Sequence, residues 1–272
     1  MRHLRYILPA IVILASSCGE YSKLLKSTDY QLKMDKSKEY YEAGKYVKST
    51  ELIEQILPRY RASESGEELT WILAQSYYGM RQYEMAGSYF NSYVENFRYG
   101  KNIEEATFMS ALCDYYISPR AELDLSNTRR AMEGFTVYMA RYPMGTKVTE
   151  AEQYLTELRE RLVEKSYLSA RLYYDMKQYK AAVTALSNSL KAFADSKYRE
   201  EMMFLKLSSL YMYAENSYAV FQKERFQNTL DDYYSFMEEF PESRYAKNVR
   251  KIYEDTAGFL KIDVNDPQPN TQ

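Results

Sequence analysis

The chain has 272 residues, of which 36 are Lys or Arg and 38 are Asp or Glu, and its formal net charge at pH 7 is −2. This balance argues against a nucleic-acid-binding protein, which would carry a basic excess. The one histidine, His3, lies in a segment predicted below to be removed, which excludes Ser-His-Asp and Cys-His catalysis and most catalytic zinc sites. We therefore predict no enzyme, no cofactor, no metal site and no nucleic-acid partner.

Residues 1–17 have the three-part layout of a secretory signal. Two arginines form a short positive start, residues 6–15 are apolar, and two serines close the segment with side chains small enough for a cleavage site. The apolar run is too short to span a hydrocarbon core of about 30 Å, which needs about 20 residues. We predict that residues 1–17 are a lipoprotein signal peptide that is removed.

Cys18 ends the stretch LASSC (14–18), which resembles a bacterial lipobox except that leucine lies four residues before the cysteine rather than three. A thiol is nucleophilic enough to form the thioether to lipid. We predict Cys18 as the lipid-attachment residue, carrying diacylglycerol and an N-acyl chain such as palmitate, with residues 18–30 as a short leash to the membrane. The alternative is ordinary signal cleavage beside a free cysteine. Cys113, the other cysteine, lies in an apolar stretch and is predicted to be a core residue.

A pattern repeats along the remainder of the chain. The stretches YYEAGKYVKSTELIEQILPRY (40–60), YYGMRQYEMAGSYFNSYVENFRYG (77–100) and YYDMKQYKAAVTALSNSLKAFADS (173–196) share a tyrosine doublet, a turn, another tyrosine and a second helix. The second helices place a small residue four positions before a large one, as in Ala86 and Phe90, so that both lie on one face. This is the tetratricopeptide pattern of stacked helix pairs.

The spacing predicts an all-α fold, a tetratricopeptide-repeat superhelix of about five helix pairs followed by a capping helix. The pairs are expected at about 31–60, 68–98, 103–142, 147–194 and 197–240, and the capping helix at 244–262, within a repeat domain over residues 31–262. Residues 118–128 are predicted to form a loop in which Ser126 or Asn127 caps the next helix. The polar tail 263–272 is predicted to be disordered.

The chain contains 30 tyrosines, eight of which form doublets at the expected ends of first helices. Most are predicted to pack in the core, and some to line the groove of the repeats, since tyrosine joins a large apolar body to a polar tip. The predicted groove-lining residues are Tyr40, Tyr77, Tyr78 and Tyr115. The sole tryptophan, Trp71, is predicted to pack rather than to contact a ligand.

The combination of a lipobox-like cysteine, a short leash and about five tetratricopeptide pairs resembles the BamD family of lipoproteins. The stretches that carry the likeness are CGEYSKLLKSTD (18–29), EEATFMSALCDYYISPRAELDLSNTRRAMEGFTVYMARYP (104–143), YYDMKQYKAAVTALSNSL (173–190) and YREEMMFLKLSSLYMYAENS (198–217). The resemblance implies a non-catalytic adaptor of the β-barrel assembly machinery, lipid-anchored in the outer membrane and facing the periplasm.

The same resemblance implies the partners. N-terminal repeats would receive unfolded outer-membrane proteins, C-terminal repeats would dock on the barrel-forming subunit through its periplasmic repeats, and other assembly lipoproteins are possible partners. The alternative is another periplasmic tetratricopeptide lipoprotein, either a glycan-uptake binding component or a pilotin-like scaffold. A glycan binder would be expected to show tryptophan platforms, and the chain has one tryptophan.

Overall fold

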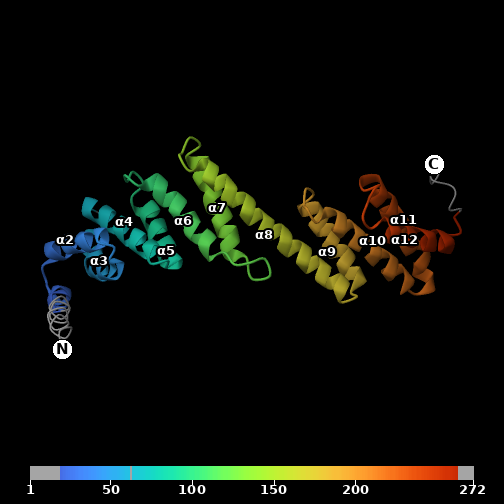
Figure 1. Ribbon diagram of the computed structural model, residues 1–272, viewed down its shortest axis with the longest axis horizontal. Coiled ribbons are helices and arrows are strands. Elements are labelled where there is room, and N and C mark those ends of the chain that lie inside the picture. The colour runs from blue at the N-terminus through green and yellow to red at the C-terminus, as the bar shows by residue number, and fades with distance from the viewer. Residues whose placement is uncertain (1–18, 62, 263–272) are drawn as a thin grey trace, which may run out of the picture. The chain divides into compact units, whose positions relative to one another are not determined.

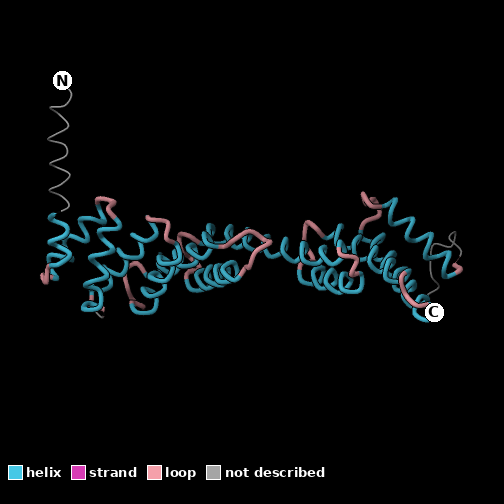
Figure 2. The backbone as a smooth tube through the Cα atoms, turned by 90° about the horizontal axis from the view of Figure 1, so that it is seen from below, coloured by secondary structure: helices cyan, strands magenta, loops and turns pink. Residues whose placement is uncertain are grey.

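The computed structural model describes residues 19–61 and 63–262, and this part of the chain contains helices and loops without a strand (Figure 2). Residues 19–26 form a helical segment inside the predicted leash, and eleven further helices follow (Figure 1). They are α2 (Tyr30–Glu42), α3 (Tyr46–Tyr60), α4 (Glu64–Gly79), α5 (Tyr83–Asn96), α6 (Ile103–Ile117), α7 (Ser126–Arg141), α8 (Val148–Asp175), α9 (Tyr179–Ala192), α10 (Arg199–Glu215), α11 (Ala219–Glu239) and α12 (Ala246–Leu260).

These helices confirm the predicted all-α architecture of tetratricopeptide-like pairs. The five expected pairs correspond to α2–α3, α4–α5, α6–α7, α8–α9 and α10–α11, and α12 is the expected last helix. The small and large residues of the second helices are fully buried, as the spacing predicts: Ala86, Phe90, Ala131, Phe135, Ala182 and Leu186. No helix between residues 19 and 262 that the structure describes is both long and apolar enough to cross a bilayer.

The first helices end at the tyrosine doublets, whose carbonyl groups accept hydrogen bonds from the turn that follows. In three hairpins the second residue after the helix has a positive φ: Gly44 at 68°, and Arg81 and Lys177 at 59°. The N–H of Gly44 donates to the carbonyl of Tyr41 at 2.9 Å, and the N–H of the next residue donates to the carbonyl of Tyr40 at 2.8 Å. The other two hairpins repeat these bonds, which satisfy carbonyls that the helix itself leaves without partners.

The second helices end on an aromatic residue with the same backbone conformation, whether or not proline follows. Phe97, Tyr142, Phe193 and Phe240 have φ between −134° and −124°. Each carbonyl accepts from the N–H three residues later, which turns the chain into the next helix. The predicted cap of α7 is wrong, because neither Ser126 nor Asn127 caps it; α7 begins at Ser126, whose N–H donates to the Asp124 carboxylate at 3.0 Å.

The helices form two compact units, each with its own core. Among the described residues, the first comprises 19–61, 63–120 and 124–158, and the second comprises 121–123 and 159–262. The largest buried cluster of the first unit lies on α4 to α7 and the start of α8, and contains Phe90, Tyr93, Phe108, Phe135 and Tyr138. In the second unit, Leu207 and Phe236 pack with Val249 and Ile252 of α12. Cys113 is buried in the first core, as predicted.

Candidate protein-binding site

The first two predicted contact tyrosines lie at the ends of α2 and α4 with different neighbours. The Tyr40 ring contacts the Tyr21 ring at 5.7 Å, with the Lys48 ammonium 5.5 Å from its centroid. The Tyr77 ring stacks on Tyr89 at 5.4 Å, and its hydroxyl donates to the Glu54 carboxylate. Burial, followed by that hydrogen bond, raises the pKa of Tyr77.

Tyr78 and Tyr115 belong to a continuous cluster of rings in the first unit. Tyr78 contacts Tyr83 at 5.6 Å and Tyr116 at 6.2 Å, and Tyr115 contacts Tyr116 at 5.7 Å and Tyr154 at 4.4 Å. The Tyr115 hydroxyl donates to a carboxylate of α8. The structure therefore brings Tyr78 and Tyr115 together through Tyr116, while Tyr40 and Tyr77 each have a separate set of neighbours.

A hollow of about 530 Å³ lies beside the first helices of two successive pairs, and none of the four predicted tyrosines lines it. We call it the acidic hollow. Its lining residues come from α2, α4 and the turn before α6: Lys38, Tyr41, Glu42, Glu64, Glu67, Glu68, Trp71, Ile72, Lys101 and Asn102. Four carboxylates against two ammonium groups give it a negative balance, and two aromatic side chains give it apolar surface.

Trp71 both packs and faces this hollow. Its ring contacts Phe90 at 5.6 Å and Tyr93 at 5.7 Å, in agreement with the predicted packing role, yet the residue is only half-buried and lines the hollow. Tyr41, the second member of the first doublet, lines the hollow and was not among the predicted groove residues. The only available signal was the doublet itself, because adjacent helical residues point about 100° apart.

Glu67 fixes one wall of the acidic hollow. Its carboxylate accepts from the Tyr93 hydroxyl at 2.5 Å and from the N–H of Lys101 at 2.8 Å, and the Tyr93 oxygen accepts from the N–H of Asn102 at 3.0 Å. Burial, followed by the bond to Glu67, raises the pKa of Tyr93 to about 12. A protonated Tyr93 thus holds α5, the start of α4 and the turn into α6 in one arrangement.

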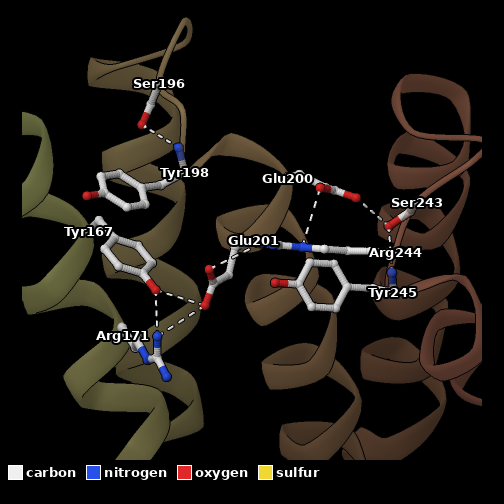
Figure 3. A network of polar contacts seen from close by, with 9 residues as sticks. All are labelled: Tyr167, Arg171, Ser196, Tyr198, Glu200, Glu201, Ser243, Arg244 and Tyr245. Carbon is white, nitrogen blue, oxygen red and sulfur yellow. Dashed lines mark hydrogen bonds and ion pairs between the residues drawn. The ribbon is translucent and has the colours of Figure 1, made fainter.

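The second unit contains a polar network that joins α8, α10 and the turn before α12 (Figure 3). The Glu201 carboxylate accepts from the Tyr167 hydroxyl at 2.8 Å and from Arg171 at 3.2 Å, and Arg244 approaches it to 3.5 Å. Figure 3 shows the Tyr198 ring facing Tyr167, with the two rings parallel and 4.2 Å apart. Because its charges are mutually paired, the network stabilises neighbouring helices and offers no isolated nucleophile or base.

The described residues include one cysteine, Cys113, and it is buried. Burial raises the pKa of the Cys113 thiol to about 12, so it is protonated at neutral pH. Among residues 19–61 and 63–262, no group of three or more His, Cys, Asp or Glu side chains is arranged to hold a metal ion. Cys18, the predicted lipid-attachment residue, lies outside the described residues. The aromatic and charged side chains that line the acidic hollow are suited to binding by shape, aromatic contact and charge.

Comparison with solved structures finds repeat proteins at low similarity. Two structures of a Podosopora anserina kinesin light chain with nearly identical TPR-like repeats have TM-scores of 0.35 and 0.34 at 15% and 13% identity; each comparison covers 78% of this chain, and 96% and 97% of the other. The pHSP90 complex of the TPR2AB domain of yeast Sti1 has a TM-score of 0.36 at 13% identity, covering 84% of this chain and 98% of the other. No curated protein matches the chain.

A protein-family model matches most of the chain. The model of the YfiO family, described as outer membrane lipoprotein, matches residues 29–223. This span is more than two thirds of the chain, and it confirms the resemblance predicted from the sequence. The protein therefore belongs to the YfiO, or BamD, family of outer membrane lipoproteins.

Proposed function

We propose that this protein is an adaptor of the β-barrel assembly machinery, anchored through acylated Cys18 in the outer membrane and facing the periplasm. It binds unfolded outer-membrane proteins and docks on the barrel-forming subunit, which inserts them. Family membership over residues 29–223 and the lipobox-like LASSC stretch support the location. The helix pairs support the binding role, because stacked repeats present extended surfaces to partner chains.

The acidic hollow is the single observation that carries the binding proposal. Tyr41 and Trp71 offer flat apolar surfaces with polar edges, and the surrounding carboxylates favour a segment that is neutral or basic. An extended, aromatic-rich segment of an unfolded outer-membrane protein has this chemistry and gains affinity from side-chain pockets along its length. Tyr40, Tyr77, Tyr78 and Tyr115 stay predicted contacts on the neighbouring surface of the first unit.

The second unit offers a surface for the barrel-forming subunit. Tyr218 and Val220 at the start of α11 are 83% and 79% exposed, and Phe221 beside them is 46% exposed. A cluster of exposed apolar side chains at one position is typical of a protein contact. In the proposed arrangement the first unit receives substrate and the second unit joins the machinery.

In-cell crosslinking followed by mass spectrometry tests the proposal. A photoreactive residue at position 71 is expected to capture unfolded outer-membrane proteins, and one at position 220 to capture a large protein with a C-terminal barrel and soluble N-terminal repeats. The matched control is position 99, where the fully exposed Tyr99 lies outside the acidic hollow. Capture of only a nutrient transporter or a pilus component would overturn the proposal and favour a different lipoprotein scaffold.

A further inference from the structure

The helical segment 19–26 is fixed against the first repeat at both of its ends. The Tyr21 hydroxyl donates to the Glu51 carboxylate, and its ring contacts Tyr40 at 5.7 Å. The carbonyl of Leu25 accepts from the Lys33 ammonium at 3.0 Å, and Leu24 is 9% exposed. A segment with a buried leucine and two polar contacts to the repeats is part of the folded unit rather than a slack leash.

The contacts also give this segment a direction. Tyr21 meets Tyr40 in the last turn of α2, whereas Leu25 meets Lys33 in the first turn of α2. The beginning of the segment therefore lies at the edge of the unit where α2 turns into α3. Cys18 precedes Tyr21 by three residues, a length of chain that spans at most about 11 Å at 3.8 Å per residue.

This edge has the surface chemistry of a headgroup contact. The turns at residues 43–48 and 80–82 carry Lys45, Lys48 and Arg81 and no carboxylate. Val47 is 58% exposed there, and residues 44–48 line a shallow hollow together with Met80. Cations attract lipid phosphates, and an apolar side chain among them gains free energy by entering the boundary between headgroups and acyl chains.

We infer that the edge formed by the α2–α3 and α4–α5 turns lies directly against the phospholipid surface in which acylated Cys18 is embedded. This inference rests on the lipid attachment of the proposed function and adds an orientation to it. Tyr21 fixes the segment that follows Cys18 against the first helix pair. The first unit therefore presents this edge to the membrane, and its opposite edge lies farther from the membrane. The opposite edge carries the fully exposed Tyr99, and the 14 residues of α5 separate the two edges by about 20 Å.

Site-specific fluorescence on the full acylated chain tests the orientation. The variants Val47→Cys and Tyr99→Cys, each in a Cys113→Ala background, are labelled with an environment-sensitive dye and reconstituted into phosphatidylethanolamine and phosphatidylglycerol vesicles that contain spin-labelled lipid. The dye at position 47 is expected to lose about half of its emission or more, since interfacial side chains lie roughly 5–10 Å into the headgroup boundary. The dye at position 99 is expected to stay unquenched. Equal quenching at the two positions, or none at position 47, would overturn the inference.

Two further measurements distinguish a failure of the proposed orientation from a failure of the proposed lipid attachment. The mass of the N-terminal peptide reports whether Cys18 is acylated, and an unmodified peptide would contradict the proposed attachment rather than the orientation. Tyr21→Ala, in the acylated and membrane-bound chain, is expected to reduce quenching at position 47 because it releases the segment from Tyr40. Unchanged quenching in that variant would contradict the role of Tyr21 as the link.

Discussion

Gly44, Arg81 and Lys177 occupy equivalent places in three hairpin turns, and all have positive φ. Only glycine adopts this conformation without a steric penalty from its own Cβ. The repeat therefore imposes a backbone shape that the side chains at two of the three positions oppose. The hydrogen bonds to the carbonyls of the tyrosine doublets offset this strain.

Replacing Gly44 with alanine is expected to destabilise the first unit by about 1 kcal/mol. No atom lies within 4 Å of the added Cβ, so the effect is conformational and not a clash. Urea unfolding followed by the fluorescence of Trp71, the sole tryptophan, measures this unit. Gly258→Ala, followed by far-ultraviolet circular dichroism because α12 belongs to the second unit, is the matched control: its surroundings are also open, but it lies inside α12, where alanine is expected to stabilise the helix by up to about 1 kcal/mol. Equal effects of the same sign would contradict this account.

At the residue scale, the sequence predicted which residues are buried better than which ones face a partner. The buried Ala86 and Phe90 follow from spacing along one helix. The orientation of a tyrosine doublet depends instead on where the neighbouring helix crosses, which the local sequence does not specify. Tyr41 lines the acidic hollow while Tyr40 contacts Tyr21, although the two are adjacent in the chain.

At the scale of elements, two helix pairs of the first unit, α4–α5 and α6–α7, share one arrangement of side chains where the second helix ends. A tyrosine of the second helix donates to a glutamate of the preceding first helix, and a glycine leaves room for the pair: Tyr93, Glu67 and Gly100 in one copy, and Tyr138, Glu104 and Gly145 in the next. The second unit places serine at the position of these glycines. Ser196 and Ser243 accept from the N–H of the tyrosine two residues later.

Gly100→Ala is expected to destabilise the first unit by about 1–3 kcal/mol, because the new Cβ would lie 2.6 Å from the Tyr93 hydroxyl. In a Tyr93→Phe background the loss is expected to be smaller, since that hydroxyl is gone. Urea unfolding of the two single variants and the double variant gives the coupling free energy between the two substitutions, which is expected to be at least about 0.5 kcal/mol. Strictly additive effects would show that the clash lies instead with the Glu67 carboxylate, 2.8 Å away, and the Phe97 carbonyl, 2.9 Å away.

The ends of the helices could be predicted from the sequence where a recurring motif or a helix-terminating residue marked them. The tyrosine doublets and terminal aromatics predicted the ends of first and second helices because they recur. The segment 19–26 was predicted as a leash because it occurs once and its helix is stabilised by tertiary contacts of Tyr21, Leu24 and Leu25. The cap of α7 was wrong because Asp124, two residues earlier, accepts the N–H of Ser126.

The last helix, α12, is expected to be essential for the second unit. Val249, Ile252 and Tyr253 are buried on it, and their burial contributes roughly 5 kcal/mol, comparable with the stability of a whole small unit. Ending the chain at residue 244 is expected to make residues 159–244 sensitive to protease while Trp71 keeps its native emission. Ile252→Ala should weaken the unit by about 2–4 kcal/mol, and Lys251→Ala on the exposed face should leave it unchanged. A protease-resistant truncated unit would show that α12 is dispensable.

At the scale of the whole molecule, buried tyrosines make the stability of both units depend on pH in the alkaline range. Burial, with a bond to Glu67, raises the pKa of Tyr93 to about 12, and burial near Glu215 and Asp255 raises the pKa of Tyr211 to about 12. The ordinary value for tyrosine is about 10. Between these values the unfolded chain loses its tyrosine protons while the folded chain keeps them, so unfolding releases protons and becomes more favourable as pH rises.

The stability contributed by these tyrosines is therefore complete below pH 10 and is lost as pH rises from about 10 to about 12. Urea midpoints measured at pH 8, 10 and 11 are expected to fall for both units, the first followed by Trp71 fluorescence and the second by far-ultraviolet circular dichroism. Tyr93→Phe removes the titrating group and is expected to flatten the fall in the first unit by an amount of the order of 1 kcal/mol, whereas Tyr211→Phe is expected to act on the second unit alone. If each variant kept the full pH dependence of its own unit, the loss would have to come from another group. In the first unit the buried Cys113, whose pKa is also raised to about 12, would be the next to replace.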